Sequence, residues 1–155
     1  MPRSGDKPSA APAPRIGAMV GQLRAELVRV TRQVLAGHGI RLNYSLVEVL
    51  WRLGERGPMC AAELTRAFPY DSGGMTRLID QLQTRALVER RPHPTDRRVQ
   101  DVVLTVEGKK LSRKLIALRE QVVSAAVGDL AAPEQTRLAG YLQRMLAALR
   151  NSSAG

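Results

Sequence analysis

The segment "MTRLIDQLQTRALVERRPHPTDRRVQDVVLT" (Met75–Thr105) joins an amphipathic helical pattern to two β-branched runs around a proline-containing turn. Its first apolar residues recur at the spacing of one helical face, namely Met75, Leu78, Ile79 and Leu82. The runs "LVERR" and "RVQDVVLT" flank "PHPTD", and prolines suit the turn of such a hairpin. The segment therefore predicts a helix over 72–85 followed by a two-stranded hairpin.

Three further helices are expected before this segment. The first, over 15–35, has apolar residues at alternating intervals of four and three positions, which is typical of a helix that packs along a partner helix. Two short helices are expected over 44–56 and 61–67. Asn43 and the capping box Ser45-x-x-Glu48 are alternative starts for the first of these two.

Two more helices are expected after the hairpin. Thr105 is a candidate N-cap for one of them, and Pro133 suits the first turn of the other. Both helices carry apolar stripes, over 111–122 and 138–149, in addition to the seam of the first helix. A single small domain needs less apolar surface than this, so the stripes favour burial against a second copy of the chain.

The order of elements predicts a mainly α, winged-helix fold of the α+β type, with six helices and a two-stranded wing. We expect a disordered tail over 1–14, which is rich in Pro, Ala and Ser. A dimerisation helix over 15–40 precedes a winged helix-turn-helix lobe over 42–104. Dimerisation helices over 105–150 complete a homodimer held by its N- and C-terminal helices.

The charge balance points to a polyanionic partner. The 155 residues contain 24 Lys and Arg against 14 Asp and Glu, a net charge of +10 and a pI near 11.0. Only 3% of the residues are aromatic, which argues against single-stranded nucleic acid, since its binding depends on base stacking. Neither a signal peptide nor a membrane-spanning run is recognisable, so we expect a cytoplasmic protein that binds double-stranded DNA and no membrane.

The predicted helix over 72–85 would be the recognition helix, because the second helix of a helix-turn-helix enters the major groove. With its apolar stripe buried, Arg77 can bind a guanine or a phosphate. An arginine at the hairpin tip can reach a narrow minor groove, and Arg97 and Arg98 are equivalent candidates. The complete set of candidate DNA-binding residues is Ser72, Gly73, Thr76, Arg77, Arg91, Arg97 and Arg98.

Two details of this region have alternative interpretations. Asp96 cannot contact a phosphate, so we expect it to orient the wing by pairing with a guanidinium, most simply that of Arg98. Gly73 and Gly74 are unusual in a helix. They leave the backbone N–H groups open to a phosphate, or they mark a frayed first turn.

The stretch from Met75 to Leu111 resembles the core signature of MarR-family transcriptional regulators, which are bacterial homodimeric winged helix-turn-helix proteins. The matching positions are Thr76-Arg77-Leu78, Asp80, Leu82, Leu87-Val88, Arg90-Arg91, Asp96-Arg97-Arg98, Leu104-Thr105 and Gly108. Weaker similarity covers "LVEVLWRLGERGP", and the helix order matches over about 15–150. The sequence departs from the family pattern at Gly73 and Gly74, where larger residues are usual, and at Ala86, where Gly is usual.

The resemblance implies a ligand-responsive, sequence-specific transcriptional regulator, with a repressor favoured, that binds a palindromic operator as a dimer. A small aromatic carboxylate or phenolic effector would release it. The available polar and aromatic groups for such a ligand are His38, Arg41, Tyr44 and Trp51, among which Arg41 can bind a carboxylate with both nitrogens.

Alternative functions predict different features of the sequence. Some members of the family are switched by cysteine oxidation, but Cys60 stands away from the usual position. A non-specific architectural DNA-binding protein would use the wing alone, and a protein-interaction module would leave the charge unexplained. No catalytic set, cofactor motif or metal cluster can be assembled, so we expect neither an enzyme nor a cofactor.

Overall fold

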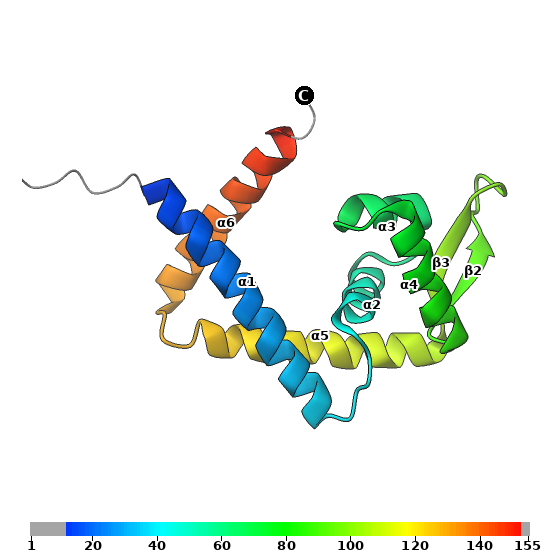
Figure 1. Ribbon diagram of the computed structural model, residues 1–155, viewed down its shortest axis with the longest axis horizontal. Coiled ribbons are helices and arrows are strands. Elements are labelled where there is room, and N and C mark those ends of the chain that lie inside the picture. Colours follow the sequence, from blue (N-terminus) through cyan, green and yellow to red (C-terminus); the bar gives the residue numbers. More distant parts are fainter. Residues whose placement is uncertain (1–11, 153–155) are drawn as a thin grey trace, which may run out of the picture. The chain divides into compact units, whose positions relative to one another are not determined.

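The computed structural model describes residues 12–152, which form helices and one small sheet (Figure 1). The elements follow the order α1 (Pro12–Gly37), α2 (Tyr44–Arg56), β1 (Met59–Cys60), α3 (Ala61–Ala67), α4 (Ser72–Thr84), β2 (Val88–Pro92), β3 (Gln100–Leu104), α5 (Val106–Ala126) and α6 (Ala132–Ser152). The six predicted helices are confirmed. The described residues divide after Arg119 into two compact units, the second of which holds the end of α5 and α6.

The first helix is longer than expected. α1 begins at Pro12 instead of Arg15, and proline is compatible with a first helical turn because its missing N–H has no partner there. The predicted tail over 1–14 is therefore too long at its C-terminal end. Its remaining residues, 1–11, lie outside the described part of the chain.

The start of α2 is decided by Asn43, which was one of two alternatives. The backbone N–H of Leu46 donates to Asn43 Oδ1 at 2.9 Å. Ser45 instead accepts a hydrogen bond from the hydroxyl of Tyr70 at 2.8 Å. The Ser45 side chain thus joins α2 to the loop between α3 and α4 and does not cap its own helix.

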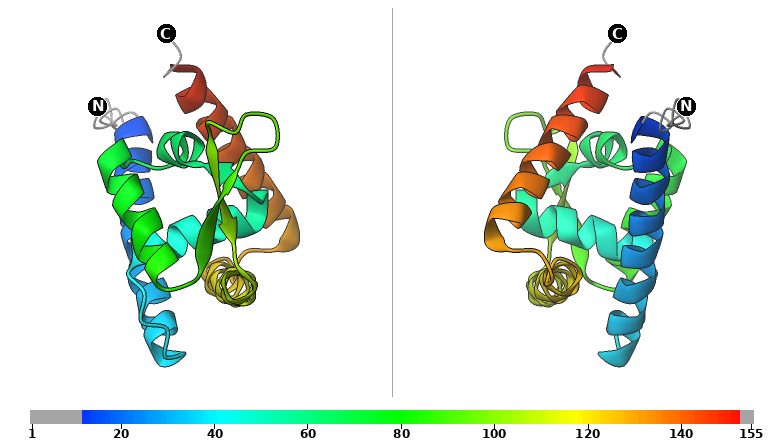
Figure 2. Two further views of the ribbon diagram at one scale, coloured as in Figure 1. Left: turned by 90° about the vertical axis from the view of Figure 1, so that its right-hand side faces the viewer. Right: turned by 90° about the vertical axis from the view of Figure 1, so that its left-hand side faces the viewer.

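The sheet has three strands, whereas the sequence predicted two. β2 and β3 form the expected antiparallel hairpin, with Val88 opposite Leu104, and β1 pairs with the other edge of β3, with Met59 opposite Val102. A strand of two residues is too short to show an alternating pattern, so only pairing with β3 reveals it. Figure 2 shows the twisted β2–β3 pair ending in an open loop.

The core of the first unit lies among α2–α5 and the sheet. The predicted stripe of α4 is buried, with Met75, Ile79 and Leu82 fully inaccessible and Leu78 8% exposed. Leu50 and Leu53 of α2 belong to the same cluster. The winged helix-turn-helix is thus organised as the spacing of apolar residues predicted.

The apolar stripe of α5 has a different role from the expected one. Leu115 is fully buried and Leu118 is 5% exposed, and both belong to the core of the chain itself. The expectation that the 111–122 stripe packs against a second copy is therefore wrong for these positions. Burial within one protomer satisfies them, because α5 packs on α2.

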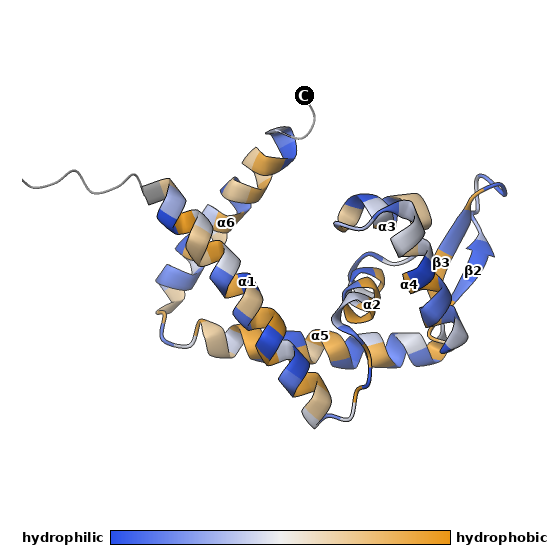
Figure 3. Ribbon diagram, viewed as in Figure 1, coloured by the Kyte–Doolittle hydropathy of each residue, from blue (hydrophilic) through white to orange (hydrophobic). Residues whose placement is uncertain are grey.

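Most of the exposed large apolar side chains belong instead to α1 and α6. Figure 3 shows hydrophobic residues recurring along the ribbons of both helices. The exposed large apolar side chains on α1 are Ile16, Met19, Val20 and Leu23, and those on α6 are Leu138, Tyr141, Leu142, Met145, Leu146 and Leu149. Apolar surface of this extent on a helix is typical of an interface. Over 12–152, no helix combines the length and the apolar character that crossing a bilayer requires.

Ala86 provides a test of the turn between α4 and β2. Its φ angle is +55°, in the left-handed region that favours glycine. Ala86→Gly should relieve this strain. Glycine also increases the conformational entropy of the unfolded chain, which offsets part of the gain, so the free energy of unfolding should rise by about 0.5–1 kcal/mol. Thermal unfolding at a fixed protein concentration measures the change, and an unchanged or lowered melting temperature would contradict it.

Candidate nucleic-acid interface

The N-terminus of α4 is tightly capped. The N–H of Gly74 donates to Asp71 Oδ1 at 2.6 Å, so the first turn is ordered and this amide already has an acceptor. A Cβ at position 74 would lie 3.1 Å from that oxygen, whereas one at Gly73 would have ordinary room at 3.6 Å. The capping bond therefore favours an ordered first turn and occupies the Gly74 amide, and a side chain at position 74 would press on Asp71.

The outward face of α4 carries the expected polar groups. Ser72, Gly73, Thr76 and Arg77 are all exposed, as helical phase predicted. The hydroxyl of Thr76 donates to the carbonyl of Ser72 at 2.8 Å, so this side chain offers an acceptor oxygen and a methyl group outward. Within residues 12–152, Arg77 has no ion-pair partner, which leaves its guanidinium available for a ligand.

A contact that the sequence did not indicate fixes the wing to α4. Arg90 of β2 forms an ion pair with Asp80 at 2.6 Å and also donates to Gln83 Oε1. Both acceptors lie on α4, so this arginine joins the wing to the recognition helix. The partly exposed ion pair thus links β2 to α4.

Asp96 organises the turn of the wing, although not through a guanidinium. Its Oδ1 accepts from the backbone N–H of Arg98 at 3.0 Å, and its carbonyl accepts from the N–H of Val99 at 3.0 Å. Among the described residues Asp96 forms this Asx turn and no ion pair, so the expected pairing with a guanidinium is not seen. Arg97 and Arg98 are both exposed, and no described residue forms an ion pair with either.

Arg91 differs from the arginines at the tip. It lies on β2 and forms an ion pair with Glu89, two residues away on the same face of the strand. Its charge is thus partly neutralised within the wing, while those of Arg97 and Arg98 are not. The strongest unpaired positive charge of the wing is at its tip.

A cavity of about 490 Å³ opens between α1, α2 and the loop before α4. Its lining includes the cations Arg24 and Arg32 of α1, the carboxylate Glu48 of α2 and Tyr70. The Tyr70 hydroxyl lies 3.2 Å from Glu48 Oε2 as well as bonding Ser45. The cavity therefore combines positive groups for an anion with a carboxylate that can accept a hydrogen bond.

Tyr44 also lines this cavity, and its environment keeps the phenol protonated. Partial burial raises the pKa of Tyr44 above its ordinary value, and the negative charge of Glu48 raises it further. The hydroxyl therefore remains a donor throughout the physiological pH range. Its ring meets Trp51 edge-on, with centroids 5.7 Å apart.

The structure does not gather the four predicted ligand residues into one cavity. Tyr44 lines the cavity described above, whereas Arg41 lines a second one of about 370 Å³, and Arg32 borders both. Trp51 is buried beneath Tyr44 and stacks under Arg119, at 5.2 Å from ring centroid to guanidinium. His38 is exposed in the turn after α1. The eight-residue spacing of Arg24 and Arg32 predicts that they share a face of α1. No pattern in the sequence predicts that Tyr70 lines the same cavity.

Cys60 lies at the junction of β1 and α3, half-buried, as a free thiol. Its N–H donates to Glu63 Oε2 at 2.8 Å, and this bond lowers the pKa of the Glu63 carboxyl. The backbone N–H of Cys60 thus takes part in capping the N-terminus of α3, and the charged group beside it, Glu63, is an anion. Nothing in this contact activates the thiol by positive charge.

Comparison with known proteins agrees with these features. Residues 42–99 match the family model described as MarR family. The HTH-type transcriptional repressor NicR of Pseudomonas putida is 32% identical over 97 residues, which cover 63% of this chain. The aligned part spans 61% of the length of NicR, so the chain covers less than two thirds of this relative.

Two solved structures share the fold. A mutant MarR from E. coli complexed with operator DNA is 23% identical, with a TM-score of 0.72 and coverage of 85% of this chain and 94% of that one. The other is Bordetella bronchiseptica BpsR, whose DNA binding is regulated by 6-hydroxynicotinic acid. It is 22% identical, with a TM-score of 0.71 and coverage of 92% and 97%. The family-model match over residues 42–99, the 32% identity to NicR and the winged helix-turn-helix make this chain similar to MarR-family transcriptional regulators.

Proposed function

We propose that the protein is a transcriptional regulator of the bacterial cytoplasm, acting as a repressor that binds a palindromic operator as a homodimer. One observation carries the proposal: Arg77 on α4 and Arg97 and Arg98 at the wing tip are exposed and unpaired among the described residues, on two elements that Arg90 holds together. NicR is named as a repressor, and the MarR structure contains operator DNA. Both support the assignment of double-stranded DNA as the partner.

Replacing Arg97 or Arg98 by Ala should weaken operator binding by ~1–3 kcal/mol for whichever residue enters the minor groove. Fluorescence anisotropy with a duplex from the protein's own promoter, at several salt concentrations, measures the effect. The logarithm of the binding constant falls with the logarithm of the salt concentration, and each phosphate contact adds roughly 0.9 to the steepness of this slope. Lys114→Ala, which removes an exposed charge from α5, is the control and should leave affinity nearly unchanged. Unaltered affinity in both arginine variants would remove the wing from the mechanism.

The same titration separates specific regulation from architectural binding. A regulator should prefer the promoter duplex to a scrambled duplex of equal length by at least ~1,000-fold. Equal affinity for both duplexes at every salt concentration would instead indicate a non-specific architectural protein.

The effector that we propose is a small aromatic carboxylate with a ring hydroxyl, bound in the cavity between α1 and α2. Arg24 and Arg32 would hold the carboxylate, and Glu48 would accept from the hydroxyl. The regulator of BpsR, 6-hydroxynicotinic acid, is a molecule with both groups. The chemistry of the cavity and this relative's ligand therefore favour the same class.

Two arginine variants locate the effector site. Arg24 lines only the larger cavity and Arg41 only the smaller one. Arg24→Gln should raise the concentration of 6-hydroxynicotinic acid needed for half-release of the operator by about tenfold, since a charge-assisted bond contributes roughly 1.5–3 kcal/mol. Arg41→Gln should leave it unchanged. The reverse pattern would assign the effector to the smaller cavity, and no release by this acid would reject its chemical class.

A further inference from the structure

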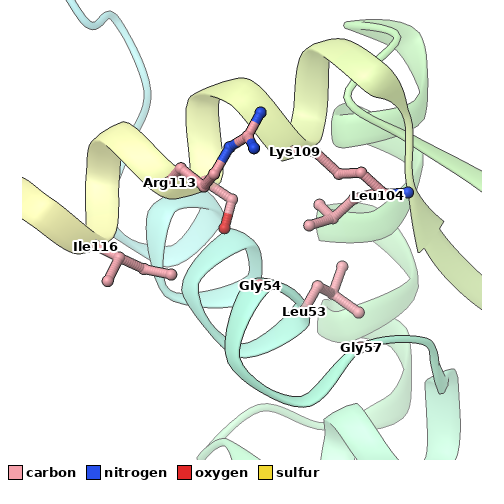
Figure 4. Close-up of a pocket in the computed structure, with 8 residues that line it drawn as sticks. Leu53, Gly54, Gly57, Leu104, Lys109, Arg113 and Ile116 are labelled. Atoms are coloured by element: carbon pink, nitrogen blue, oxygen red, sulfur yellow. The ribbon is translucent and has the colours of Figure 1, made fainter.

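A separate cavity of about 300 Å³ lies between the end of α2 and the beginning of α5. Figure 4 shows the side chains of Leu53, Leu104 and Ile116 directed toward this space, with Lys109 and Arg113 on α5 beside it. None of its lining residues belongs to the effector cavity proposed above. Its floor is apolar, and the charged groups on its lining are all cations.

Backbone constraints keep the α2 side of this cavity bare. A Cβ at Gly54 would overlap Ser112 Oγ, which donates to the carbonyl of Leu50 at 2.9 Å, and would lie 3.1 Å from Ile116 Cδ1. Gly57 has a φ angle of +83°, which a larger residue rarely adopts. The space is therefore bordered by rigid backbone, and a ligand would not have to displace a side chain from α2.

Two cations border the cavity, and Figure 4 shows the Lys109 ammonium on the side of Leu104 and the Arg113 guanidinium farther along α5. Lys109 and Arg113 are four residues apart on α5, so they share a face of the helix. Both are exposed, and neither has an ion-pair partner among the described residues. Glu107, the nearest acidic residue of the helix, pairs with Lys110 instead. The positive charge beside the apolar floor is thus uncompensated.

We propose that this cavity is a second small-molecule site, which binds an apolar monocarboxylate. The ring or short chain would contact Leu53, Leu104 and Ile116, and Lys109 or Arg113 would hold the carboxylate at the border of the cavity. A volume of about 300 Å³ accommodates a molecule of one or two rings. The proposal does not depend on the DNA-binding function, because it rests on this lining alone. The alternative is a structural role, in which the two cations stabilise the C-terminal carbonyl groups of α2 and bind no ligand.

Two-dimensional amide NMR of the full chain tests the site with 2-naphthoate as the probe. The expected result is saturable shifts at 53–57, 104 and 109–116, at millimolar concentration or below. The uncharged analogue 2-naphthamide should bind at least tenfold more weakly. Lys109→Gln combined with Arg113→Gln should weaken 2-naphthoate binding at least tenfold, and Arg24→Gln should leave these shifts unchanged.

A second variant excludes a purely structural role of the cations. Ile116→Phe should fill the apolar part of the cavity and block the probe while both positive charges remain. The proposal is overturned if no shifts occur at these positions or if 2-naphthamide binds equally well. It is also overturned if Arg24→Gln abolishes the shifts, or if the double variant loses thermal stability without losing the probe.

Discussion

Leu142→Asp is expected to abolish operator binding by converting the protein to a folded monomer. Leu142 is 40% exposed on α6, where Leu138 and Met145 are exposed on the same face. A carboxylate there cannot be buried against a second copy without a large desolvation cost. Two linked half-site contacts bind far more tightly than one, so the affinity for a palindromic duplex should fall at least ~100-fold. Size-exclusion chromatography with light scattering and anisotropy measure the two effects.

Ala147→Asp is the matched control, because it introduces the same charge on the opposite face of α6. It should remain dimeric and bind the duplex normally. Leu115→Asp should behave differently from both, since Leu115 is fully buried in the core of the protomer, and should unfold the chain. A tight dimer in the Leu142→Asp variant would show that α6 is not part of the interface.

Gly108→Ala is expected to destabilise the folded chain by about 3 kcal/mol. A Cβ at this position would overlap the carbonyl oxygen of Leu87 and lie 2.9 Å from its carbonyl carbon. The same oxygen accepts the backbone N–H of Thr105 at 3.1 Å. The helix must therefore move away from the base of the wing, and the hydrogen bond is lost with it. Chemical denaturation at fixed protein concentration measures the loss.

Gly73→Ala is the control for this substitution. A Cβ at Gly73 lies at ordinary van der Waals distances of 3.6 Å or more, so the variant should be unchanged or slightly more stable through helix propensity. If the Gly108→Ala variant had the same free energy of unfolding as the wild type, α5 would be able to shift away from Leu87 at little energetic cost. The close contact between Gly108 and the Leu87 carbonyl would then not be a constraint on the position of α5.

The sequence alone determined most of the winged helix-turn-helix. Apolar periodicity predicted α4 and which of its residues are buried, because helical phase depends on local spacing. Local capping chemistry likewise placed Thr105, whose Oγ1 accepts from the N–H of Gly108 at 3.0 Å. The cluster of arginines at the hairpin followed from charge, although their contacts with DNA remain a prediction. These features depend on residues close together in the chain, so a single sequence specifies them.

Contacts between residues distant in sequence became known only from the three-dimensional structure. The structure shows that Arg90 forms an ion pair with Asp80 and that the Tyr70 hydroxyl donates a hydrogen bond to Ser45. It also shows that Leu115 is buried in the core of the protomer instead of a dimer interface. It also revealed β1, which exists only through its pairing with β3. An apolar stripe is the same in sequence whether it packs against its own chain or another, and a surface arginine has several acidic residues within reach. Packing in three dimensions selects among these partners, which local periodicity cannot do.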